Sequence, residues 1–164
     1  MKKRILTLMC ALTVSMLVAM TFAQERLLPN LKKMDNLESV YVGKTLLRMI
    51  ANENVEGLNL ADGMFDAADF IKYIDSIEVI SAESKKATNY LRPLAEEAIS
   101  KLNDMELAMQ TEDNNEYVRI YVQPTADGNS FSRIVVVNSE EGEYNIIDMR
   151  GTFPYDILSS FTEN

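Results

Sequence analysis

The chain has 164 residues, with 16 basic and 25 acidic side chains, one cysteine, and neither histidine nor tryptophan. Without histidine it lacks the side chain whose ordinary pKa suits proton transfer near neutral pH, and the commonest ligand of zinc, copper and iron. Its net charge of −9 disfavours nucleic acid and anionic lipid surfaces as partners.

The N-terminus is typical of a secretory signal peptide. Lys2, Lys3 and Arg4 precede an apolar stretch from residue 5 to about residue 19. Ala23 is a small residue at a position that a signal peptidase recognises. The stretch is shorter than the ~20 apolar residues of a membrane-spanning helix. We expect cleavage after Ala23 and export to the periplasm or cell envelope, with no membrane span left. The alternatives are an uncleaved anchor and a lipid-modified Cys10.

Cleavage would leave residues 24–164 as a single α+β domain. It would remove Cys10, three of the 16 basic residues and none of the 25 acidic ones, which gives a net charge of −12. The mature chain would then have no thiol, no disulfide and no thiolate metal site. A chain of this length can bury about 68% of the surface that its unfolded form exposes, so packing alone can stabilise it.

The first expected elements are a strand and a helix. Residues 37–42 are rich in β-branched and aromatic side chains, and residues 44–51 place Leu46, Leu47 and Ile50 on one helical face. The Gly-Lys-Thr sequence at residues 43–45 is similar to the end of a phosphate-binding loop. That loop needs glycine where Glu38 stands, so we exclude a nucleotide site.

A long loop is expected over residues 52–63, next to a group of carboxylates. Asp62, Asp66 and Asp69 are the candidate metal ligands of the chain, because carboxylate oxygens suit calcium. Their spacing does not follow the alternating ligand order of the calcium loop. Charge clusters of this kind are usually solvated surface, which is the simpler interpretation.

The clearest predicted helix covers residues 81–103 and follows a strand that ends near residue 81. Ser81 is the expected N-cap, and Ala87, Leu91 and other apolar residues recur at steps of three and four. Pro93 lies inside this helix. Because proline removes a backbone hydrogen bond and clashes with the carbonyl four residues back, we predict a kink or a break there.

From Met105 onward the apolar period changes to two. Strands are expected at residues 105–110, 117–122, 130–138 and 143–150, separated by polar or glycine-containing turns. The predicted fold is therefore α+β, with an antiparallel meander of about four strands plus one or two further strands, and helices packed mainly on one face. A final short helix is expected from Pro154, with Ile157, Leu158 and Phe161 on one face.

Three tyrosines are the candidate binding residues. Tyr117, Tyr121 and Tyr144 are expected to line the outer face of the sheet, although tyrosines on sheets more often pack across strands. No catalytic residues are predicted, because Ser81 and Ser84 near the lysines of residues 85–86 match no known serine–lysine spacing.

Three segments together resemble a known family. They are LESVYVGK at residues 37–44 before a helix, IDSIEVI at residues 74–80 before the long helix, and IDMRGTF at residues 147–153 at the end of the meander. The chain resembles the DUF4252 family, small exported proteins of Bacteroidetes whose domain has no known function. The resemblance implies an envelope or periplasmic protein and carries over no functional residue.

The predicted function is a non-enzymatic binding or protein-interaction module, whose partner is an envelope protein or a small ligand. No cofactor is expected. The alternative is a carboxylate-based hydrolase or a calcium-dependent protein that uses Asp62, Asp66 and Asp69.

Overall fold

The computed structural model describes residues 26–52 and 71–157. The chain divides into two compact units, residues 1–32 and residues 33–164. The described part of the first unit, residues 26–32, contains no helix or strand. Every element named below belongs to the second unit.

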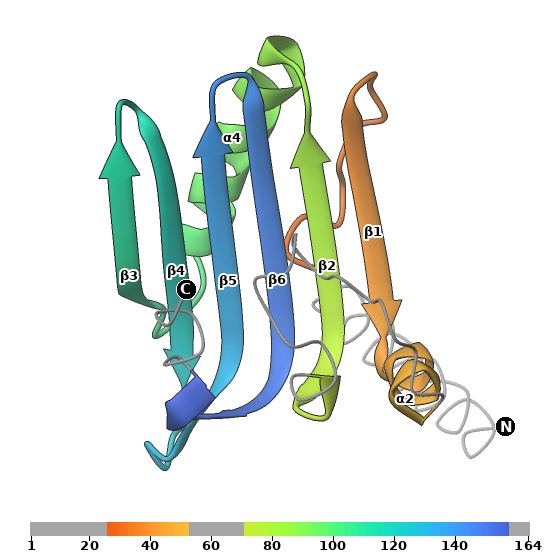
Figure 1. Ribbon diagram of the computed structural model, residues 1–164, viewed down its shortest axis with the longest axis vertical. Coiled ribbons are helices and arrows are strands. Elements are labelled where there is room, and N and C mark those ends of the chain that lie inside the picture. Colours follow the sequence, from red (N-terminus) through yellow and green to blue (C-terminus); the bar gives the residue numbers. More distant parts are fainter. Residues whose placement is uncertain (1–25, 53–70, 158–164) are drawn as a thin grey trace, which may run out of the picture. The chain divides into compact units, whose positions relative to one another are not determined.

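The second unit is built around one antiparallel sheet (Figure 1). In chain order the elements are β1 (Leu37–Gly43), α2 (Lys44–Asn52), β2 (Ile74–Ala82), α4 (Lys85–Ser100), β3 (Glu106–Asp113), β4 (Glu116–Pro124), β5 (Ser130–Glu140) and β6 (Glu143–Pro154). The six strands lie side by side in the order β1-β2-β6-β5-β4-β3.

The predicted meander is present as β3 to β6, each strand pairing with the next. The sheet is larger than this meander, because β2 pairs along β6 from Ile74–Gly151 to Ala82–Tyr144, and β1 pairs with β2. The earlier strands thus extend the sheet at its β6 edge.

The central strands are buried on both faces of the sheet. In β5, residues 133–137 are all buried, so this strand has no solvent-exposed face in its centre. Register places Ile80, Ile146 and Val137 in one row on the face that we call the α4 face. Ile77, Met149 and Ile134 form a row on the opposite face.

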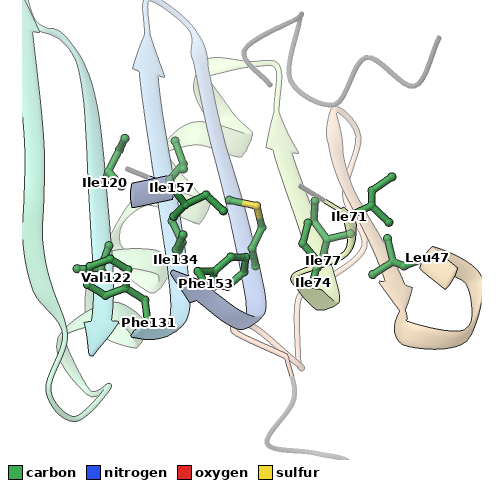
Figure 2. Packing of buried hydrophobic residues seen from close by; sticks show 12 residues of the cluster. Leu47, Ile71, Ile74, Ile77, Ile120, Val122, Phe131, Ile134, Phe153 and Ile157 are labelled. Carbon is green, nitrogen blue, oxygen red and sulfur yellow. The ribbon is translucent and has the colours of Figure 1, made fainter. Parts of the chain in front are cut away.

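The opposite face carries the main apolar cluster, shown in Figure 2. Leu47 of α2 belongs to this cluster, whereas α4 packs on the α4 face and lies behind the sheet in Figure 1. The prediction that helices pack mainly on one face is therefore not confirmed. Within α2, Ile50 packs against the cluster, but Leu46 is 49% exposed and does not share the buried face.

Helix α4 begins later than predicted. Its N-cap is Ser84, whose Oγ accepts a hydrogen bond from the Ala87 N–H at 3.2 Å. Ser81 lies within β2 and pairs with Glu38 and Asn145, so the N-cap prediction was wrong by three residues.

The helix also runs through Pro93 as one element, so the predicted break does not occur. The carbonyl four residues back belongs to Asn89. Pro93 and Asn89 are both exposed, which lets water replace the missing N–H donor.

Strand β6 continues further than predicted. It runs through Pro154, which pairs with Ser130, while the buried Phe153 pairs with Phe131. Residues 155–157 then form a 3₁₀ turn that buries Ile157, in place of the predicted α-helix start. The predicted partners on its face, Leu158 and Phe161, lie outside the described residues.

Candidate ligand-binding groove

The three predicted tyrosines lie on the α4 face. Tyr117 and Tyr121 are two alternations apart on β4, so both side chains point to the same side of the sheet. Ser139 of β5 pairs with both Tyr117 and Tyr144, which brings the tyrosine of β6 into the same row. Residues from two non-adjacent strands are thereby gathered on one surface.

A pocket of about 150 Å³ lies on this surface, between the second half of α4 and the sheet. We call it the α4 groove. Its lining residues are Glu96, Ile99, Ser100, Arg119, Tyr121, Val137 and Tyr144. Tyr121 and Tyr144 line the groove itself, and Tyr117 is the neighbour of Tyr144.

Tyr144 differs from its predicted place on an outer face, because it is only 1% exposed. Burial raises the pKa of Tyr144 above its ordinary value, and the electrostatic interaction and hydrogen bond with the adjacent Tyr117 raise it further. The phenol therefore stays neutral. Tyr144 is thus a core residue that also contributes to the lining of the groove.

Two arginines accompany the tyrosines. The Arg119 guanidinium lies 4.1 Å from the Tyr117 ring centroid, and its Nε donates to Gln110 Oε1 at 3.2 Å. The Arg92 guanidinium lies 5.4 Å from the Tyr144 ring centroid, and its Nη2 donates to Ser139 Oγ at 2.9 Å. Each cation is thus held against an aromatic ring.

Neither arginine was predicted as a site residue from the sequence. Arg119 could have been found, because it stands midway between Tyr117 and Tyr121 in a strand of period two and so must share their face. Arg92 lies on a helix, and nothing in the local pattern of α4 indicates which sheet residue it meets.

The α4 face also carries buried charges at other positions. Arg133 Nε and Nη2 donate to the two carboxylate oxygens of Asp148, each at 2.6 Å, and both residues are buried. Arg150 Nε lies 3.9 Å from the same carboxylate, and the buried Glu78 pairs with Asp148 across β2 and β6. These residues do not line the groove, and we assign them a structural role.

A second pocket, of about 210 Å³, lies at the β3–β4 hairpin. Its lining is acidic, with the carboxylates of Glu112, Asp113, Glu116 and Glu140 beside Tyr117. Asn114 and Asn115 form the turn there with positive φ angles of 49° and 74°, as two-residue hairpin turns require.

The candidate metal ligands Asp62, Asp66 and Asp69 lie outside the described residues. Across residues 26–52 and 71–157, no three acidic, cysteine or histidine side chains come together in a way that could hold a metal ion. No helix in the same ranges is long and apolar enough to cross a membrane.

A family model described as a domain of unknown function, DUF4252, matches residues 31–161. The chain belongs to the DUF4252 family. The match spans every strand of the sheet and all of the α4 groove, and it confirms the resemblance read from the three sequence segments. No curated protein matches the chain.

Proposed function

We propose that this DUF4252 domain is an exported, non-enzymatic binding module of the cell envelope, and that the α4 groove is its binding surface. The observation that carries the proposal is the gathering of Tyr121, Tyr144 and Arg119 in one pocket. Tyrosine and arginine are the residue types enriched in the cores and hot spots of protein interfaces.

The size of the groove favours an anchor residue of a larger partner. Pockets for drug-sized ligands have volumes of ~300–1,000 Å³, whereas the α4 groove has about 150 Å³. It can take a single side chain or functional group. Ile99 and Val137 supply apolar contact on either side, so the ligand group would combine an apolar body with a polar end.

The chemistry of the lining supports binding in preference to catalysis. The hydroxyl of Ser100 donates to the backbone carbonyl of Glu97 at 2.8 Å, so it is not directed at a base. Burial keeps the Tyr144 phenol protonated. Glu96 is exposed at the rim, where its carboxylate is solvated. Fixed donors and aromatic surface are what these residues offer.

Export is part of the proposal and is supported by the charged start and short apolar stretch of residues 1–23. Mass spectrometry of the protein isolated from the cell envelope tests it. We expect a chain that begins at Gln24. Recovery of a chain that retains Met1 or Cys10 would contradict export by cleavage.

Site-specific photo-cross-linking in intact cells tests the binding surface. A benzophenone amino acid replaces Ser100, at the groove, and in a matched strain it replaces Asn129, an exposed residue of the β4–β5 turn. We expect a discrete adduct from position 100 and none from position 129. The absence of an adduct at position 100, or equal adducts at both, would refute the proposed surface.

A further inference from the structure

We propose that the α4 groove recognises a carboxylate presented by a polypeptide, with Arg119 as its direct ligand; this rests on the proposed function of the groove. Arg119 is held in a fixed orientation. Its ring contact with Tyr117 and its Nε bond to Gln110 fix the plane of the guanidinium. Neither of these two interactions uses the Nη1 and Nη2 donors of Arg119.

Those donors have no partner among the described residues, and no carboxylate there forms an ion pair with Arg119. A guanidinium that is stacked on an aromatic ring presents its free edge as a planar fork. The group that matches such a fork with two parallel hydrogen bonds is a carboxylate or a phosphate.

An arginine on the same sheet face, Arg133, already has a carboxylate partner. Arg133 meets both oxygens of Asp148 at 2.6 Å, which is the two-bond geometry expected for a carboxylate. Arg119 lies on the same face at the groove without such a partner. A ligand carboxylate would complete at Arg119 the arrangement that Asp148 completes at Arg133.

Two cationic side chains are available at the groove, although the protein as a whole is acidic: Arg119 lines it and Arg92 lies against its Tyr144. Arg92 Nε is buried and has no hydrogen-bond acceptor among the described residues, so this side chain keeps one unused donor beside Tyr144. Among the described residues, two carboxylates oppose the two arginines: Glu96 lines the groove, and Glu112 accepts a hydrogen bond at 3.1 Å from the same Gln110 amide that bonds Arg119. More distant acidic groups are screened beyond ~8 Å at physiological ionic strength.

The residues that line the α4 groove favour a carboxylate that belongs to a polypeptide. The volume of about 150 Å³ fits one residue, and Ile99, Tyr121 and Val137 provide an apolar surface next to Arg119. An acidic side chain or a C-terminal carboxylate, with an apolar side chain beside it, would contact both the Arg119 guanidinium and this apolar surface. The neutral phenol of Tyr144 does not repel it.

Ligand-observed ¹⁹F NMR tests this with the protein purified from the envelope. The probes are N-acetyl-4-fluorophenylalanine, its C-terminal amide, and 4-fluorobenzoate. We expect the acid to bind roughly tenfold more tightly than the amide, because a charge-assisted pair is lost in the amide. We also expect it to bind more tightly than 4-fluorobenzoate, which lacks the peptide part.

Three variants assign the effect. Arg119→Gln should abolish the preference for the acid, whereas Glu96→Gln should strengthen binding of the acid about two- to fivefold by removing the opposing charge. Arg48→Gln, on the exposed surface of α2, is the matched control and should leave all three affinities unchanged. A purely structural role of Arg119 would not predict the opposite sign at Glu96.

Equal binding of acid and amide, binding of neither, or an acid preference that survives Arg119→Gln would overturn the inference. Tighter binding of 4-fluorobenzoate would overturn a polypeptide as the source. If position 100 gives its cross-link but the acid preference is absent, this inference fails and the proposed surface stands. If the cross-link is absent as well, both fail.

Discussion

Replacement of Arg133 by methionine should strongly destabilise the sheet. Arg133 and Asp148 are 5% and 2% exposed, so the variant leaves the Asp148 carboxylate buried without Arg133. Among the described residues, the cation that stays near this carboxylate is Arg150, whose Nε lies 3.9 Å away. Breaking a buried ion pair by removing one partner typically costs about 3–5 kcal/mol. Because Arg150 offsets part of this cost, we expect Arg133→Met to lower the free energy of unfolding by about 3 kcal/mol.

Removing both charges should cost less than removing one. In Arg133→Met/Asp148→Leu, no unpaired charge is left at this position, and apolar replacement of a complete buried pair is often close to neutral. We expect the double variant to be more stable than Arg133→Met by roughly 2 kcal/mol. Such non-additivity is the signature of residues in direct contact.

Urea unfolding at pH 7, analysed by linear extrapolation, measures these free energies of unfolding. Lys101→Met is the control, because its ion pair with Glu97 is exposed and should contribute nothing measurable. If the free energy of unfolding of Arg133→Met lies within ~1 kcal/mol of the wild-type value with an unchanged slope, the buried pair does not stabilise the sheet.

Three further predictions concern Tyr144, Gly151 and Ser84. The folded pKa of Tyr144 lies above the unfolded value of 10.0, so its contribution is fully present below pH 10 and is lost as pH rises beyond it. Urea titrations at pH 9–11 should show a smaller alkaline loss of stability in Tyr144→Phe than in the wild type; equal losses would refute this. Gly151→Ala should cost about 1–3 kcal/mol in the same assay, since its Cβ would lie 1.8 Å from the Tyr73 carbonyl oxygen, and an unchanged stability would contradict that contact. Ser84→Ala should lower the free energy of unfolding by ~1 kcal/mol through loss of the N-cap, while Ser81→Ala should not remove any cap.

Local patterns predicted most of the elements. The strand at Leu37–Gly43, helix α2 and the four meander strands follow from β-branched content, helical period and turn residues. The N-cap could not be decided locally, because Ser81 and Ser84 both suit the role. Pairing of Ala82 with Leu37 and Tyr144 extends β2 past Ser81 and settles it.

Contacts between distant strands could not be read from the sequence. The Arg133–Asp148 pair depends on the register of β5 against β6, and the position of Tyr144 beside Tyr117 depends on two such registers. Alternation along β4 did place Tyr117 and Tyr121 together. The buried state of Tyr144 arises from α4, whose packing across the sheet no local pattern specifies.

Binding of an envelope partner through Arg119 is tested by the cross-link from position 100 in intact cells, measured in the wild type and in Arg119→Gln. If the α4 groove binds an envelope partner through its arginine, a discrete adduct will form in the wild type and will weaken in the variant, while the turn position Asn129 stays unreacted. An adduct of equal yield in both proteins, or none in either, would show that the groove does not bind such a partner through Arg119.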